Sequence, residues 1–78
     1  MATIEGDVTE WNETNHCWYI RVPTHIDAIV EYEAPFQLNP TLARLEQQNG
    51  SILGWTAEFY VDSEGFAIVV HADPRRLN

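Results

Sequence analysis

We expect the chain to fold around residues 51–72, which read SILGWTAEFYVDSEGFAIVVHA. As far as residue 61, apolar and polar side chains alternate. A period of two predicts a strand with one buried face. A turn signal at 62–65 and an almost continuous apolar run at 66–72 follow, so we predict a hairpin whose second strand is covered on both faces.

The rest of the chain supplies the partners of this hairpin. Three further strands are predicted at 2–11, 17–22 and 25–34. One short helix is predicted, with Asn39 as its N-cap and Pro40 at its first position. The order β-β-β-α-β-β indicates an α+β fold, a small, mostly antiparallel five-stranded sheet with the helix packed on one face. The other face of the sheet is then left to solvent or to a partner.

Length and cysteine content limit the class of protein. The 78 residues predict a single domain over 1–78, in which 73–78 form a polar C-terminal tail. Cys17 is the single cysteine, which excludes an intramolecular disulfide. No apolar run is long enough for a membrane span, and no secretory signal is evident. We therefore expect a cytoplasmic protein with no membrane contact.

Charge is the strongest feature of the composition. Twelve Asp and Glu face four Arg and no Lys, for a formal charge of −8. Direct binding to nucleic acid or to an anionic membrane is disfavoured, because both depend on Lys and Arg. The natural complement is a basic protein surface, such as that of a nucleic-acid-binding protein or complex. The alternative is that the acidic surface only keeps a small domain soluble.

A candidate partner surface follows from the alternation. The sheet face opposite the helix collects carboxylates and aromatic rings, and the turn acids extend it. Trp and Tyr surrounded by charge are typical of protein–protein contacts, although aromatic pairs also stabilise small sheets. The residues predicted to contact the partner are Glu5, Asp7, Trp11, Tyr19, Asp27, Glu31, Glu33, Glu58, Tyr60, Asp62 and Glu64.

The charge density of this face can be compared with that of a nucleic acid. Residues two apart on a strand, such as Glu31 and Glu33, place one charge per roughly 6.6 Å. One strand of duplex DNA carries a charge about every 3.4 Å. A nucleic-acid mimic therefore needs the first and third predicted strands on the same exposed face.

Catalytic chemistry has little support. His16, Cys17, His25 and His71 match no metal-ligand spacing, and a Cys–His nucleophile would need a pocket that gathers them. Carboxylates on an open sheet face lack the enclosed site that general acid–base catalysis needs. We predict a non-enzymatic protein without a metal or cofactor.

The predicted function is that of a small inhibitor. In this hypothesis the acidic face occupies a basic, nucleic-acid-binding surface of a partner, as a phage anti-CRISPR or anti-restriction protein would. One alternative is an immunity or antitoxin protein that neutralises a toxin nuclease. Another is a homodimeric structural or scaffold subunit, in which residues 66–72 or the aromatic face bury against a second copy.

Overall fold

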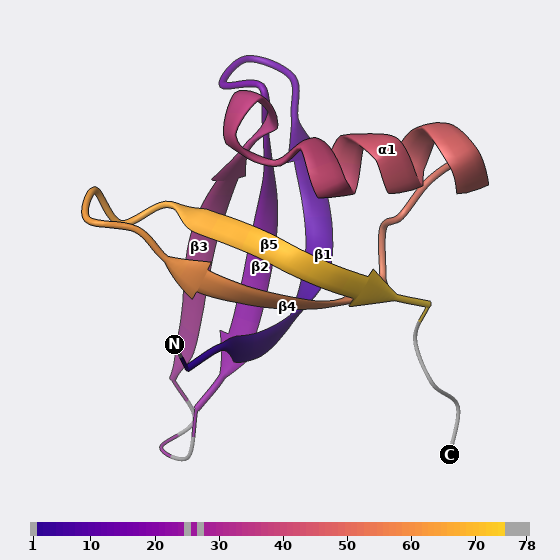
Figure 1. The fold of residues 1–78 in the computed structure, drawn as a ribbon. Helices are drawn as coiled ribbons and strands as arrows, with labels where there is room; N and C mark the ends of the chain where they lie inside the picture. Colours follow the sequence, from indigo (N-terminus) through magenta and orange to yellow (C-terminus); the bar gives the residue numbers. More distant parts are fainter. Residues whose placement is uncertain (1, 25, 27, 75–78) are drawn as a thin grey trace.

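The computed structural model describes residues 2–24, 26 and 28–74. Within these residues, five antiparallel strands form one sheet in the order β3-β2-β1-β4-β5, and a helix packs on it (Figure 1). The predicted α+β class and the predicted order of strands and helix are confirmed. None of the helices in the described residues is long and apolar enough to cross a membrane. The bounds are β1 Ile4–Asn12, β2 Cys17–Pro23, β3 Ile29–Pro35, η1 Phe36–Leu38 (a 3-10 turn), α1 Pro40–Asn49, β4 Thr56–Val61 and β5 Ala67–Asp73.

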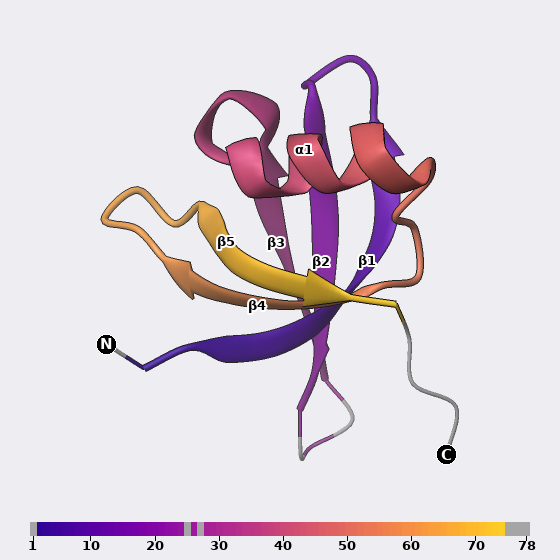
Figure 2. The same ribbon diagram turned by 45° about the vertical axis from the view of Figure 1, so that its right-hand side comes forward.

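The sheet curls over on itself. Two different segments of β1 pair with two different strands, and each segment belongs to one half of the sheet. Residues 4–7 of β1 pair with β4, and residues 7–12 pair with β2. Figures 1 and 2 show β1 bending between these two partners. The rings of Tyr32 on β3 and Phe59 on β4 lie 5.4 Å apart, although β2 and β1 separate those strands in the sheet. The inner face is therefore covered largely by the opposite half of the sheet, and not by the helix alone as the sequence predicted.

Gly6 comes directly before Asp7, the residue at which the pairing of β1 passes from β4 to β2. A Cβ atom there would lie 2.7 Å from Ile20 Cγ2 and 2.9 Å from the Arg21 carbonyl oxygen. These distances are too short for real contacts, so the absence of a side chain lets β2 approach β1. The next irregularity follows at Thr9, where the pairing skips from Val8–Ile20 to Glu10–Tyr19. Such a bulge bends the strand and increases its twist.

The bulge at Thr9 changes the predicted position of Trp11. Strict alternation placed Trp11 on the outer face beside Tyr19, and this position is wrong. Because Thr9 is an extra residue in β1, the side chains after it exchange faces. Trp11 is half-buried, packs against the core and lies 4.8 Å from the ring of Trp18.

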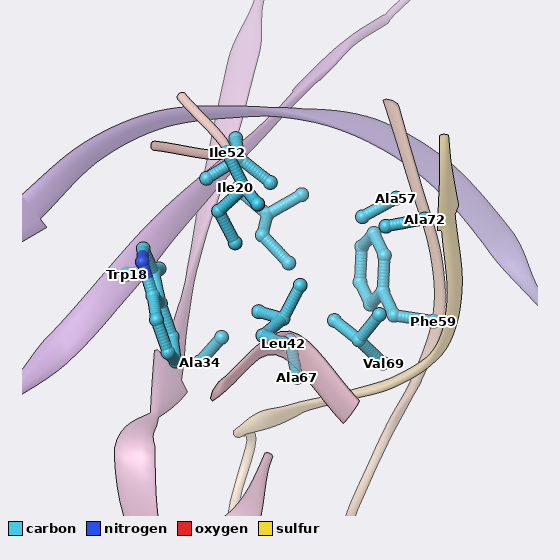
Figure 3. Close-up of a cluster of buried hydrophobic side chains, with 11 residues drawn as sticks. Trp18, Ile20, Ala34, Leu42, Ile52, Ala57, Phe59, Ala67, Val69 and Ala72 are labelled. Atoms are coloured by element: carbon cyan, nitrogen blue, oxygen red, sulfur yellow. The ribbon is translucent and has the colours of Figure 1, made fainter. Parts of the chain in front are cut away.

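The core fills the space between the two halves of the sheet and α1. Figure 3 shows its side chains converging from β2, β3, β4, β5 and α1 beneath the arch of β1. Leu42 is the fully buried residue of α1, and Ile52 closes the core from the segment before β4. The buried cluster consists of Val8, Trp18, Ile20, Ala34, Leu42, Ile52, Ala57, Phe59, Ala67, Val69 and Ala72.

Two strand boundaries differ from the prediction. The third strand begins at Ile29 rather than at residue 25, and residues 25 and 27 lie outside the described residues. The fourth begins at Thr56, because the preceding segment turns back on β1: the Gly54 amide donates to the Val8 carbonyl at 2.6 Å. The alternation over residues 51–61 predicted Leu53 on the buried side of this strand, but the side chain is exposed.

The last strand is covered on one face only. We expected both faces of 66–72 to be buried, but Val70 is 49% exposed. The pairing with β4 skips from Glu58–His71 to Phe59–Val69, so Val70 is the extra residue of a second bulge. β5 is also an edge of the sheet, so a strand pairs with it on one side only.

Candidate functional site

The outer face of the curled sheet gathers most of the acidic residues. Alternation about the buried positions turns seven of the eleven carboxylates in the described residues to this side, on four of the five strands. We call this surface the acidic face. Its carboxylates are Glu5, Asp7 and Glu10 on β1, Glu31 and Glu33 on β3, Glu58 on β4 and Asp73 on β5.

Two rows of the acidic face run across β2. In the first, Arg21 pairs with Asp7 on β1 and with Glu31 on β3. The Arg21 guanidinium lies 3.7 Å from Glu31, and both side chains are about half exposed. An exposed pair of this kind contributes roughly 0–1 kcal/mol, and the single charge of Arg21 cannot balance all the carboxylates of the acidic face.

The second row places an aromatic ring between two carboxylates. Tyr19 pairs with Glu10 on one side and with Glu33 on the other. The Asn12 side-chain amide donates a hydrogen bond to the Tyr19 hydroxyl oxygen at 2.8 Å. This bond holds the ring in one orientation, so a partner would meet a fixed aromatic surface with negative charge on both sides.

The half of the sheet formed by β4 and β5 continues the acidic face. Glu5 lies directly opposite Glu58, which in turn lies opposite His71. The Thr3 hydroxyl donates to Glu58 at 3.0 Å, and His71 Nε2 lies 2.7 Å from Asp73. Two carboxylates directly opposite one another destabilise a sheet, so this surface carries an energetic cost that the fold itself does not require.

Most of the predicted contact residues lie on the acidic face. They are Glu5, Asp7, Tyr19, Glu31, Glu33, Glu58 and Tyr60. Two acids of the face, Glu10 and Asp73, were absent from that prediction. The bulge at Thr9 brings Glu10 onto the face, and no local signal marks it; Asp73 is the last residue of β5, where the sequence indicated the start of a tail.

The other predicted residues have different positions. Trp11 points into the core, as described above, and Asp27 lies outside the described residues. Asp62 accepts hydrogen bonds from the amides of Glu64 and Phe66, both at 2.9 Å, so its carboxylate closes the turn between β4 and β5. Glu64 is exposed in that turn.

Cys17 is a buried thiol beside a carboxylate. Its Sγ donates to Glu33 Oε1 at 3.6 Å. Burial raises the pKa of Cys17 above its ordinary value, and the neighbouring Glu33 raises it further. The thiol is therefore held in its protonated form, which is the unreactive form.

The two histidines in the described residues, His16 and His71, do not converge with Cys17 on a metal site. His16 lies in the turn before β2, His71 lies on β5 and His25 falls outside the described residues. In the part of the chain that the structure covers, no three side chains of His, Cys, Asp or Glu are grouped so that they could hold a metal ion.

A second feature lies at the end of the β1–β2 hairpin. Four aromatic rings contact one another there: Trp11, His16, Trp18 and Phe36. Trp18 is fully buried, whereas His16 and Phe36 are exposed. Next to the exposed rings is a surface hollow of about 230 Å³, which we call the aromatic hollow and which is lined by Asn15, His16, Pro35, Phe36 and Gln37.

The chain was compared with protein-family models, with curated proteins and with solved structures. No protein-family model matches the chain, and neither the curated proteins nor the solved structures gave a match.

Proposed function

We propose that the chain is a non-enzymatic binding protein whose acidic face occupies a basic, nucleic-acid-binding surface of a partner protein. The observation that carries the proposal is the arrangement around β2. Carboxylates on β1 and β3 flank the fixed ring of Tyr19 on the side of the sheet that faces away from the core. Charge around an aromatic anchor is the composition of a protein contact, and the negative sign selects a cationic partner.

Charge density narrows the kind of nucleic acid that the face could imitate. Outward positions on one strand are about 6.6 Å apart, so acids on both β1 and β3 give about one carboxylate per 3.3 Å along the strands, with the Arg21 cation between Asp7 and Glu31 offsetting part of this charge. This density is close to the 3.4 Å or so of a single nucleic-acid strand and about half that of a duplex. The proposed target is therefore a groove that follows one strand, as in single-strand channels.

The biological setting of the proposal is cytoplasmic. An anti-CRISPR or anti-restriction protein of a phage blocks such a groove directly, and an immunity or antitoxin protein blocks that of a toxin nuclease. The phage inhibitor and the immunity protein would use the same acidic face, so only the identity of the partner distinguishes these two hypotheses. Affinity capture from the native host followed by mass spectrometry identifies that partner.

Charge reversal tests the acidic face itself. We expect Glu31→Lys with Glu33→Lys to weaken partner binding strongly, and each single reversal to weaken it partly. Glu46→Lys on α1 is the matched control, because it changes the net charge as much as each single reversal at a site away from the face. Circular dichroism and the melting temperature establish that all variants fold. Equal binding by the double variant and the control would remove β3 from the interface.

Salt dependence and competition complete the test. Steered association between opposite charges slows as ionic strength rises, so the association rate should fall about tenfold or more from low to high salt. A single-stranded oligonucleotide that binds the partner should compete with the protein. A rate that does not change with salt would contradict the proposal.

A homodimeric scaffold is the second candidate, and the exposed edge of β3 is the observation in its favour. Ile29 is 60% exposed and Val30 is 38% exposed on this edge strand. Antiparallel pairing of two β3 strands would, however, bring the carboxylates of Glu31 and Glu33 from both copies together, and like charges opposite one another are destabilising. Light scattering distinguishes the two, since the inhibitor should be a monomer before it meets its partner.

A further inference from the structure

We infer that the aromatic hollow receives an arginine side chain of the basic partner. The inference rests on the proposed function and adds a specific anchor to it. The hollow lies where the β1–β2 turn meets η1, two segments that Figure 1 shows at the same end of the molecule. The Phe36 amide donates to the His16 carbonyl at 3.0 Å, which joins the two segments and sets the shape of the hollow.

The size of the hollow favours a single side chain as its occupant. Small-molecule sites have volumes of about 300 to 1,000 Å³ and bury most of their ligand. At about 230 Å³ and open to solvent, this hollow suits one protruding side chain rather than a metabolite.

The walls of the hollow suit a planar cation. The rings of His16 and Phe36 lie 5.0 Å apart at 43°, and Trp18 stacks behind Phe36 at 5.9 Å. Guanidinium groups stack on aromatic faces, whereas an ammonium group is a compact, strongly hydrated charge. The side-chain amides of Asn15 and Gln37 also line the hollow, and their oxygens can accept the N–H groups of a guanidinium.

Charge complementarity favours a cation over an apolar side chain. Glu13 accepts a hydrogen bond from Trp11 Nε1, and the Trp11 ring lies 5.1 Å from that of His16. A carboxylate is thus held at the edge of the aromatic cluster, in a chain of net charge −8. Both features attract an arginine that a basic partner would present.

The backbone supports a role for His16 beyond packing. Among the described residues, His16 is the one non-glycine residue with a positive φ, at 56°. Asn and Gly adopt this conformation more readily than His, so the turn could be built without an imidazole. The imidazole is therefore not required by the turn, and it lies against the ring of Phe36.

Two peptides of equal charge test the inference. The probes are an oligoarginine peptide and an oligolysine peptide of the same length, added to the whole chain at low salt. We expect the arginine peptide to bind about two- to fivefold more tightly. It should also shift the NMR signals of the His16 and Phe36 rings, which the lysine peptide should leave nearly unchanged.

Variants that each lack one aromatic ring of the hollow test whether the preference for the arginine peptide arises there. His16→Asn keeps a residue that tolerates positive φ, and Phe36→Leu removes an exposed ring, so both should fold. Each should abolish the preference for arginine while leaving binding of the lysine peptide unchanged. Phe66→Leu is the matched control in the β4–β5 turn and should keep the preference.

Each outcome has a distinct meaning. Equal affinity for the two peptides, or a preference that survives Phe36→Leu, overturns the inference and leaves the acidic face as the proposed interface. A tighter complex with a neutral, leucine-rich peptide makes the hollow an apolar subsite and also overturns it. If neither basic peptide binds at low salt, the inference and the proposed function both fail.

Discussion

The Oδ1 oxygen of Asn39 accepts a hydrogen bond from the backbone amide of Val69 at 2.8 Å, although the two residues are thirty positions apart in the chain. The Nδ2 group of the same side chain donates to the carbonyl of Ala67 at 3.0 Å and to that of Pro35 at 2.9 Å. Asn39 is fully buried. Its amide therefore pairs with the edge of β5 as a neighbouring strand would, and it joins the start of α1 to the sheet.

Replacement of Asn39 should destabilise the fold. Asn39→Ala leaves the Val69 amide and the Ala67 and Pro35 carbonyls without this partner, and we expect a loss of about 2–4 kcal/mol. Asn39→Asp keeps an acceptor for Val69 but removes the donor and buries a charge, so it should be no milder. Urea unfolding at neutral pH measures both. Asn49→Ala in the exposed last turn of α1 is the control, and an Asn39→Ala loss as small as that of the control would contradict this role.

Gly6 should not tolerate a side chain. Gly6→Ala places a methyl group against Ile20 and the Arg21 carbonyl oxygen, and overpacking of this kind costs about 1–3 kcal/mol. Gly65→Asn is the comparison, because no atom beyond the chain neighbours lies within 4 Å of the added Cβ and only the backbone strain of a side chain at φ 90° remains, which Asn tolerates better than most residues. The melting temperature should fall clearly more for Gly6→Ala. Similar losses at both positions would mean that β2 does not need the close approach.

The buried thiol should make stability depend on alkaline pH. Because the pKa of Cys17 is raised in the folded chain, its stabilising contribution is complete below the ordinary value of 9.0. That contribution is lost as pH rises through the folded pKa. Urea unfolding of the native chain and of Cys17→Ala at about pH 8 and about pH 10 should show their difference in stability shrinking with pH.

Thiol reactivity gives an independent check on Cys17. The folded protein should react with iodoacetamide far more slowly than the urea-unfolded chain at the same pH. Glu33→Gln should lower the folded pKa, since the carboxylate contributes to the rise. A native thiol as reactive as that of the unfolded chain would show that Cys17 is accessible and ionises normally.

Glu5 on β1 and Glu58 on β4 lie directly opposite one another, and removing one of these two charges should raise stability and weaken partner binding. Glu58→Gln removes the repulsion from Glu5 and keeps an oxygen that can accept from Thr3, so we expect a gain of about 0.2–1 kcal/mol. The gain should shrink at high salt, which screens exposed charges. Partner affinity should fall in the same variant. Glu64→Gln in the β4–β5 turn should leave stability unchanged, and an equal gain there would indicate a general charge effect instead.

Local patterns in the sequence predicted most of the secondary structure. The helix that Asn39 and Pro40 mark begins at Pro40, and the hairpin after it is present. Seven of the predicted contact residues lie on one face because period-two alternation depends only on the pleat of each strand. The two bulges could not be predicted this way: Thr9 and Val70 carry no local signal for an extra residue, and each changes which side chains point inward.

The amino-acid sequence by itself determined the class of fold, the net charge of −8 and the side of each regular strand that carries its acids. These properties depend on composition and on neighbours two residues apart. Only the tertiary structure decided that the sheet curls, that Trp11 turns inward, that Asn39 serves β5 rather than capping α1 with its side chain, and that His16 and Phe36 frame a hollow. The physical reason is that register, bulges and close approach are fixed by packing between residues far apart in the chain, which a local pattern does not encode.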